Sequence, residues 1–366
     1  TNFYKTIKTA QPKTKIKKLI VTNLKETLPP LLRVLFTLAK EKKGGFRIEG
    51  GLAKDDIWFQ DMLAKHANTP RPKLDIRAED TALFQYSGGT TGVSKAAVAT
   101  HRNVLADTLQ MKSWMTDLNE GNEIVLMAIP LFHVYGMVAG LLFAMSVGAS
   151  MVMVPNARDL KDVLDNISKY KATIFPGVPK LYNAINNHPD VKAGKYDLSS
   201  IKACISGSAP LMRETKEEFE RLTGGKLFEA YGLSEAPTGT HCNPLNGVNK
   251  TGSIGIPLPD VDVKLVSLDD PVVQFLPKGV KKPTRGGKEI TLLDLATHRS
   301  GLPRMPGNFK PADPADPYAD YSDENLFEFL SSCTLTRDIG TSYEYSNLGA
   351  GLLGQALTRK AGKKSY

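Results

Sequence analysis

Between residues 81 and 230, apolar runs typical of strands alternate with amphipathic segments typical of helices. The expected strands cover residues 81–86, 123–129, 150–154, 172–176, 202–206 and 226–230. The expected helices cover residues 102–116, 134–146, 158–169, 178–187 and 211–222. This alternation predicts an α/β fold in which a mainly parallel sheet is flanked by helices.

The pattern changes on both sides of this region. Before it, we expect a strand over 16–21 and helices over 28–38 and 54–66. After it, the period-two alternation of 261–266 predicts a half-buried strand, and residues 277–320 are rich in Pro, Gly and charge. Helices are expected near 291–297, 323–331 and 346–361. We therefore divide the chain into an α/β domain, 1–267, and a mostly helical second domain, 268–366.

The composition is that of a globular protein. The chain has 366 residues, of which 41% are hydrophobic and 23% charged. The longest apolar run, 134–147, is shorter than the ~18 residues of a membrane span, and no signal pattern opens the chain. We expect a cytoplasmic protein. Cys204, Cys242 and Cys333 are too widely spaced for a zinc site and suggest reduced thiols.

Positive charge is concentrated at the start of the chain. Residues 1–43 hold ten lysines, one arginine and two glutamates, which accounts for the net charge of +9 of the whole chain. No recognition motif accompanies these lysines, so we expect no nucleic-acid partner. The apolar helix at 28–38 leads into Lys40, Lys42 and Lys43. It could rest on a bilayer surface, and peripheral membrane contact is therefore an open expectation beside a core-facing helix.

A glycine- and hydroxyl-rich loop is the strongest chemical signal. It lies between the apolar runs 81–85 and 96–99 and contains Ser87, Gly88, Gly89, Thr90, Thr91, Gly92 and Lys95. Glycines let a backbone turn its N–H groups toward an anion, and hydroxyls and an ammonium add donors for phosphate oxygens. The spacing is not that of a Walker-A loop. The loop predicts a phosphate-binding site of another kind.

Further motifs follow in order along the chain. His133 lies in Pro-Leu-Phe-His-Val-Tyr-Gly, and Gly207, Ser208 and Ala209 form a turn between an expected strand and an expected helix. The segment 229–235 holds Glu229, Ala230, Tyr231, Gly232 and Glu235. A tyrosine at a strand end can stack on a purine, and a single carboxylate beside substrate phosphates can hold Mg²⁺.

Together these motifs resemble those of the acyl-adenylate-forming family. Within it, their residues are most similar to those of long-chain fatty acyl-CoA synthetases. The resemblance covers residues 1–267 and implies part of that family's N-terminal domain. It implies ATP, Mg²⁺ and coenzyme A as cofactors and a fatty acid as substrate. It implies that Thr90, Thr91 and Lys95 hold the pyrophosphate end and that Glu235, with Thr91, holds Mg²⁺.

The same resemblance assigns the remaining site residues. Residues 207–209 and 229–232 would locate the adenine, with Tyr231 stacked on it, and His133 would lie beside the reacting carboxylate. Apolar residues around 132–145 would form the acyl pocket. Beyond residue 265 we find neither the family's ribose-binding Asp motif nor its C-terminal domain with the catalytic lysine. We therefore expect acyl-adenylate formation to be impaired and thioester formation to be nearly absent.

The last hundred residues resemble a different family. Residues 268–277 and 290–303, with Tyr345-Ser346-Asn347, are similar to the serine beta-lactamase and penicillin-binding-protein-like hydrolases, an α+β fold. The resemblance implies that Tyr345 is a base or proton relay for a serine nucleophile. That serine belongs to a Ser-x-x-Lys motif. Two matches, 168–171 and 199–202, lie in segments assigned to the ligase-like domain, and we attribute them to chance.

Three hypotheses follow from the sequence. The first is an acyl-CoA synthetase-like domain with impaired activity, fused to a hydrolase fragment. The second is a serine esterase or beta-lactamase-like hydrolase that uses Tyr345. The third is a non-catalytic chimera whose incomplete domains leave sheet edges and apolar faces uncovered.

Overall fold

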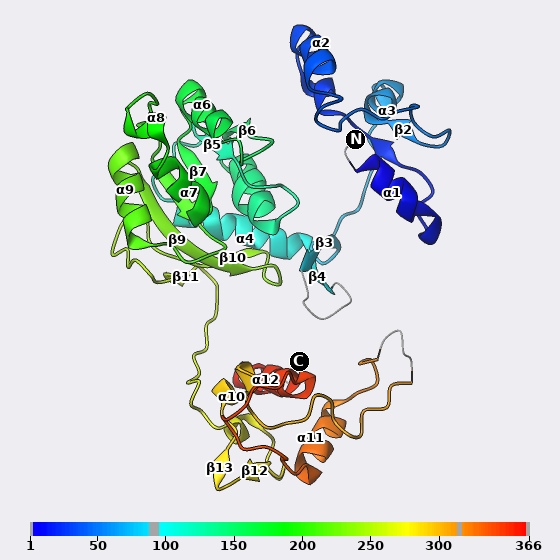
Figure 1. Cartoon of the computed structure of the whole chain (residues 1–366), viewed down its shortest axis with the longest axis vertical. Coiled ribbons are helices and arrows are strands. Elements are labelled where there is room, and N and C mark those ends of the chain that lie inside the picture. The colour runs from blue at the N-terminus through cyan, green and yellow to red at the C-terminus, as the bar shows by residue number, and fades with distance from the viewer. Residues whose placement is uncertain (1–2, 88–94, 313–316, 364–366) are drawn as a thin grey trace. The chain divides into compact units, whose positions relative to one another are not determined.

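The computed structural model describes residues 3–87, 95–312 and 317–363. Its contacts divide the chain into two units, one ending at Arg77 and the other beginning at Ala78 (Figure 1). None of the helices in the described residues is long and apolar enough to cross a bilayer.

The first unit consists of short elements. Its helices are α1 (Tyr4–Ala10), α2 (Pro30–Ala39) and α3 (Phe59–His66), with 3-10 turns at Gln11–Lys13 and Leu24–Thr27. Its strands, β1 (Ile20–Val21) and β2 (Ile57–Trp58), pair in parallel. The prediction of a helix over 28–38 is confirmed. The strand expected over 16–21 is only two residues long because β2 offers just two residues as its partner, and β2 also replaces the start of the helix expected over 54–66.

The second unit is built on a seven-stranded sheet with the order β11-β10-β9-β8-β7-β5-β6. Strands β6 (Ser150–Met153), β5 (Ile124–Met127), β7 (Ile174–Gly177), β8 (Ala203–Ser206) and β9 (Lys226–Leu233) are mutually parallel. Strands β10 (Thr238–Cys242) and β11 (Ile256–Pro257) extend the sheet in antiparallel fashion. The predicted mainly parallel sheet is confirmed, while β10 and β11 had not been predicted.

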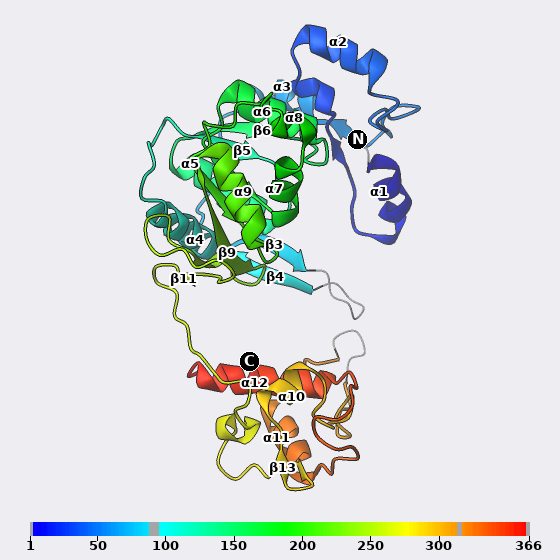
Figure 2. The ribbon, with the colours of Figure 1, turned by 60° about the vertical axis from the view of Figure 1, so that its left-hand side comes forward.

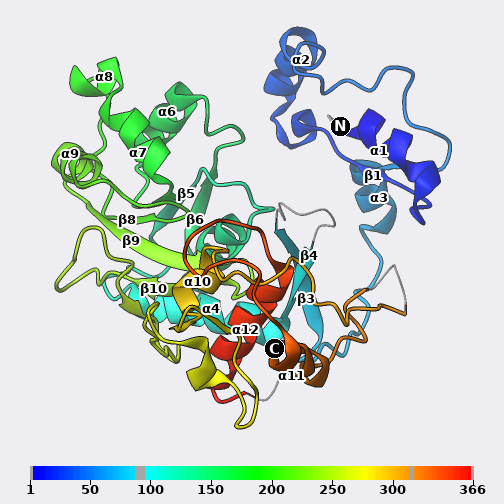
Figure 3. The same cartoon turned by 60° about the horizontal axis from the view of Figure 1, so that its bottom comes forward.

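Helices cover both faces of this sheet because successive strand residues point to opposite sides. Val125, Ile174 and Phe228 pack against one set of helices, α4 (His101–Trp114), a π-helix (Tyr135–Leu142) and α5 (Phe143–Ser146). Their chain neighbours Leu126 and Phe175 pack against the other set, α6 (Leu160–Tyr170), α7 (Pro179–Asn186) and α9 (Arg213–Thr223). Figure 3 shows α6, α7 and α9 together beside the sheet. The short α8 (Pro189–Lys192) follows α7. The five helices expected between 102 and 222 are thus confirmed.

A separate hairpin precedes the sheet. Strands β3 (Thr81–Ser87) and β4 (Lys95–Thr100) pair antiparallel, with Ser87 opposite Lys95 (Figure 2). Strand β4 runs directly into α4, where the Thr100 hydroxyl accepts the Asn103 N–H and closes a capping box. The two strand-like runs on either side of the glycine-rich loop are therefore confirmed. Residues 88–94 of that loop lie outside the described residues.

The last hundred residues form their own small core. It joins the helices α10 (Leu292–Ala296), α11 (Asp323–Ser332) and α12 (Asn347–Lys360) with a 3-10 turn at Val272–Phe275. A short hairpin of β12 (Thr284–Arg285) and β13 (Lys288–Glu289) accompanies them. The expected helices are confirmed. The strand expected over 261–266 is wrong: this segment is irregular and its Val263 and Leu265 are exposed, since no neighbouring strand supplies hydrogen-bond partners.

Candidate active site

A cavity of about 260 Å³ lies where the parallel strands of the second unit end. Residues from six separate segments line it, among them His133, Tyr135, Gly207, Ser208, Tyr231 and Thr238. Strand β6 lies on one side of β5 in the sheet, whereas β7, β8 and β9 follow in order on the other side of β5. The order in which the chain adds strands to the sheet therefore reverses at β5 and β7. In open α/β sheets, ligands bind outside the carboxyl ends of the strands at such a point.

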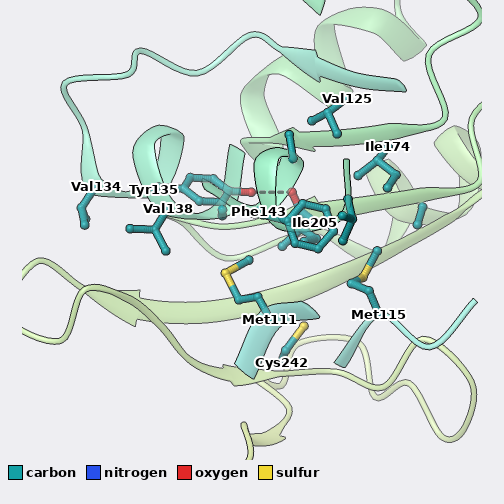
Figure 4. Packing of buried hydrophobic residues seen from close by; sticks show 14 of the residues in the cluster. Met111, Met115, Val125, Val134, Tyr135, Val138, Phe143, Ile174, Ile205 and Cys242 are labelled. Carbon is teal, nitrogen blue, oxygen red and sulfur yellow. Dashed lines mark hydrogen bonds between the residues drawn. The ribbon is translucent and has the colours of Figure 1, made fainter. Parts of the chain in front are cut away.

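Tyr135 fixes the segment that follows β5. Its hydroxyl lies at 2.7 Å from the Ile205 carbonyl oxygen of β8 and 3.2 Å from the Gly177 carbonyl oxygen of β7. Figure 4 shows the ring among apolar side chains, with its hydrogen bond to Ile205. Burial raises the pKa of the Tyr135 hydroxyl far above its usual value. The hydroxyl therefore stays neutral and acts as a donor that ties three strand ends together.

His133 lies at the mouth of the cavity with its ring exposed. Its Nδ1 accepts a hydrogen bond from the Tyr135 backbone N–H at 3.2 Å. A neutral ring held in this way carries its proton on Nε2. The ring can then donate one hydrogen bond from Nε2 to an anionic group in the cavity.

The end of β9 and the start of β10 form another wall. Tyr231 is exposed there and makes an edge contact with His241, the ring centroids being 6.2 Å apart. The two strands approach so closely that a Cβ on Gly232 would lie 1.3 Å from the Thr238 carbonyl oxygen, so only glycine fits at position 232. Thr238 itself has a φ of 97°, a rare value for a β-branched residue. Its buried hydroxyl has no hydrogen-bond partner within the described residues.

Glu229 connects two of the turns that surround the cavity. Its Oε1 accepts the Leu211 N–H at 2.8 Å and its Oε2 accepts the Gly252 N–H at 2.9 Å. The carboxylate thus joins the turn after β8 to the turn before β11. Neither Glu229 nor Ala209 lines the cavity, whereas Gly207, Ser208, Ala230, Tyr231 and Gly232 do. The part predicted for all seven in nucleotide binding stays a prediction.

Glu235 lies in the turn between β9 and β10 and is exposed. It directly follows Ser234, which lines the cavity, and its carboxylate forms no ion pair within the described residues. An uncommitted carboxylate at a cavity edge suits Mg²⁺, which takes one or two carboxylates together with phosphate oxygens. The described residues contain no group of three or more His, Cys, Asp or Glu side chains that could hold a metal ion.

The predicted phosphate loop is described only at its ends. Ser87 and Lys95 pair through their backbones at the tip of the β3–β4 hairpin. Gly88, Gly89, Thr90, Thr91 and Gly92 lie outside the described residues.

Asp107 on α4 is a buried carboxyl that sequence analysis missed. Its two oxygens lie 3.2 and 3.3 Å from the backbone nitrogen of Gly239, which lines the cavity on β10. Burial raises the pKa of Asp107 to about 7. The residue appears in the sequence as one polar position on the inner face of a helix, between Val104 and Met111. That pattern could have indicated a buried carboxyl, but it does not reveal the partner.

Tyr345 lies in the last hundred residues, just before α12 begins at Asn347. Its ring is half-buried and lies 4.6 Å, centroid to centroid, from that of His298. His298 Nδ1 accepts the Ser346 N–H at 3.2 Å.

The two Ser-x-x-Lys matches have no free serine. The Ser168 hydroxyl donates to the Asp197 carbonyl oxygen at 3.1 Å, and the Ser199 hydroxyl donates to the Asp197 carboxylate at 2.6 Å. Their lysines form ion pairs with Asp197 and Glu123 respectively. The attribution of both matches to chance stays a prediction.

Known proteins similar to this chain include long-chain-fatty-acid–CoA ligases. A long-chain-fatty-acid–CoA ligase of Bacillus subtilis (strain 168) is 40% identical over 254 residues, which cover 69% of this chain and 44% of the relative. One of Yersinia pestis is 32% identical over 267 residues, 72% of this chain and 47% of the relative. The chain thus spans about half the length of these relatives.

A solved structure shares the fold. The crystal structure of an anthranilate CoA ligase in complex with anthranoyl-AMP aligns with a TM-score of 0.53 and 25% identity. The alignment covers 66% of this chain and 45% of that protein. It agrees with the mainly parallel sheet described above.

Two family models match, and they overlap. The model of the Beta-lactamase family matches residues 253–366, which supports the second resemblance. The model described as AMP-binding enzyme matches residues 7–283, about three quarters of the chain. With the folded sheet and the motifs gathered at its edge, this match shows that the chain belongs to the AMP-binding enzyme family.

Proposed function

We propose that the second unit binds ATP with Mg²⁺ and activates a fatty acid as its acyl-adenylate, the first half of a long-chain fatty acid–CoA ligase reaction. In this step a carboxylate oxygen attacks the α-phosphorus, the bond to the bridging oxygen breaks, and pyrophosphate leaves. Transfer of the acyl group to the thiol of coenzyme A would follow. The observation that carries the proposal is the convergence of three separate motifs, at 130–136, 206–211 and 229–235, on one cavity.

The lining offers a role for each part of the substrates. Tyr231 presents an exposed ring on which a purine can stack. The Nε2–H of His133 can donate to an oxygen of the carboxylate or the α-phosphate, where negative charge accumulates in the transition state. The side chains of Met111, Val134 and Phe228 give the cavity an apolar part that suits an alkyl chain.

Glu235 would hold the metal ion. When bound, Mg²⁺ neutralises charge on phosphate oxygens and so favours departure of pyrophosphate. Lys95 at the start of β4 would supply a positive charge toward the same phosphates. Ser234, the residue before Glu235, lines the cavity and can donate a hydrogen bond to a phosphate oxygen.

The test is nucleotide binding by the whole chain, followed by fatty-acid-dependent exchange of labelled pyrophosphate into ATP. We expect ATP with Mg²⁺ to raise the melting temperature, because a ligand that binds only the folded state stabilises it. Glu235→Gln should remove the contribution of Mg²⁺, and Tyr231→Ala should weaken ATP binding by about tenfold or more.

Glu214→Gln is the matched control. Glu214 is exposed on α9, and its substitution removes the same charge at a position away from the cavity. ATP affinity that is equal in the parent chain and in Glu235→Gln and Tyr231→Ala would refute the site. Binding without any pyrophosphate exchange would limit the chain to nucleotide binding.

A second candidate function is ester or β-lactam hydrolysis through Tyr345. The match to the Beta-lactamase family and the contact between Tyr345 and His298 support it. Turnover of a nitrophenyl ester or nitrocefin that is lost in Tyr345→Phe would support it. Turnover that persists in Tyr345→Phe would assign the activity elsewhere. A chain that shows neither hydrolysis nor ATP binding would be the non-catalytic chimera.

A further inference from the structure

The helix α2 carries an apolar stripe that faces solvent. Leu31, Val34, Leu35 and Leu38 are 72%, 55%, 51% and 80% exposed. Their spacing is that of a single face of an α-helix. In an ordinary surface helix this face packs on the core and the polar face is exposed. In α2 this face is exposed instead, and the one buried side chain of the helix is that of Phe36.

Contacts on the opposite side of α2 fix this orientation. Phe36 is buried and packs against Phe46, the ring centroids being 5.5 Å apart. Arg33 donates to the carbonyl oxygens of Lys25 and Glu26 at 3.2 and 3.0 Å. Within the first unit, α2 projects away from α1 in both Figure 1 and Figure 2. The stripe is therefore held outward by the fold of its own unit.

Positive charge adjoins the stripe. Lys40, Lys42 and Lys43 follow the last turn of α2, are exposed, and form no ion pair within the described residues. By contrast, Lys8 and Lys25 are paired with carboxylates of the same unit. The three lysines thus remain available to an external anion.

We propose that α2 docks on the surface of an anionic phospholipid bilayer. The apolar stripe would enter the boundary between headgroups and acyl chains, and Lys40, Lys42 and Lys43 would contact the phosphate groups. Apolar burial and attraction to anionic lipid are the two contributions that hold an amphipathic helix at a membrane interface. A second copy of the chain suits this face less well, because each copy brings the same +9 charge of residues 1–43.

The proposal is tested by co-sedimentation of the whole chain with vesicles of phosphatidylcholine alone or mixed with phosphatidylglycerol. We expect binding to the mixed vesicles that weakens as salt is raised, and much weaker binding to the neutral vesicles. Binding that is equal on both vesicles and independent of salt would overturn the anionic surface as the partner.

Two variants separate the contributions. Leu31→Gln/Leu38→Gln removes the two most exposed leucines of α2, and Lys42→Glu/Lys43→Glu reverses the charge of two lysines that follow it. Each double variant should lower the partition coefficient of the chain onto the mixed vesicles by at least about tenfold. The matched controls are Leu105→Gln/Leu109→Gln, two exposed leucines on α4, and Lys278→Glu/Lys281→Glu, two exposed lysines elsewhere. These controls should bind as the parent chain does.

The substituted side chains are all exposed, so each variant is expected to fold, and circular dichroism checks this. Vesicle binding that is unchanged in Leu31→Gln/Leu38→Gln would overturn the proposal. The parent chain is also centrifuged without lipid. Self-association that disappears in Leu31→Gln/Leu38→Gln would assign the stripe to a second copy instead and would equally overturn the proposal.

Discussion

The buried carboxyl of Asp107 makes the stability of the second unit depend on pH in an unusual direction. Asp107 lies on the inner face of α4, and Gly239 N–H is its hydrogen-bond partner. Burial raises its pKa from 3.8 to about 7. Substitution by Asn keeps an oxygen for this N–H but removes the charge. We therefore predict that Asp107→Asn stabilises the chain at high pH.

The sign follows from proton linkage. An unfolded aspartate loses its proton near pH 3.8, whereas the folded one keeps it up to about pH 7. Stability from this group is therefore fully present below pH 3.8 and is lost as the pH rises to 7. Since one pKa unit corresponds to about 1.4 kcal/mol, the loss between these values is about 4 kcal/mol. Asp107→Asn should recover up to about 4 kcal/mol at pH 8 and little at pH 4.

The assay is urea unfolding followed by tryptophan fluorescence. The chain has two tryptophans, and Trp114 lies on α4 beside the cavity. In a Trp58→Phe background the signal reports on the second unit alone. At pH 8 the midpoint of Asp107→Asn should exceed that of the parent by about 1–2 M urea. The control is Asp262→Asn, which removes an exposed carboxylate and should not change the midpoint.

Two results would contradict the reasoning. If Asp107→Asn and its parent lose stability equally between pH 4 and 8, Asp107 is not the group that titrates. If Asp107→Asn is less stable than the parent at pH 8, the ionised carboxylate is held favourably by the Gly239 N–H and is not penalised by burial.

Three further substitutions test packing and hydrogen bonding in the second unit. Gly232→Ala should destabilise the second unit by more than about 3 kcal/mol in urea, because its Cβ would collide with the Thr238 carbonyl; Gly351→Ala, with open space around it, should be neutral or stabilising. Tyr182→Phe removes a buried hydroxyl that lies at 2.7 and 2.9 Å from two carbonyl oxygens. It should cost about 1–2 kcal/mol, and a neutral effect would show that water replaces it. Glu229→Gln can accept only one of the two N–H groups and should weaken ATP binding as well as stability, by about 1–3 kcal/mol; unchanged ATP affinity would separate the loops from the site.

The sheet could be predicted because its strands are marked twice, by apolar runs and by the helices between them. Strands β5, β7 and β8 are buried on both faces and therefore appear as continuous apolar segments. Strand β10, Thr-Gly-Thr-His-Cys, has no such signal; it forms because β9 offers it an edge and a tight turn. The opposite error occurred at 261–266, where the alternation is present but no neighbouring strand is available.

The candidate site could be predicted only in part, for a related reason. His133, Ser208 and Tyr231 belong to motifs that are continuous in sequence, and the cavity brings them together. Asp107 owes its place to a contact with Gly239, more than a hundred residues away in the chain. A local pattern carries no information about such a partner.

The two hydrogen-bonded carboxylates near the cavity, Glu229 and Asp107, illustrate how position decides chemistry. Glu229 has two backbone N–H donors, one for each oxygen, so both oxygens are hydrogen-bonded and the side chain can hold two turns together. Asp107 has a single N–H for both oxygens and lies deeper against apolar side chains, so its neutral form is favoured at pH values below 7. Glu235, exposed and unpaired within the described residues, is the carboxylate that can still accept a cation. Of these three, only Glu235 is exposed and without an ion pair within the described residues, which is why we propose it as the residue that would hold Mg²⁺.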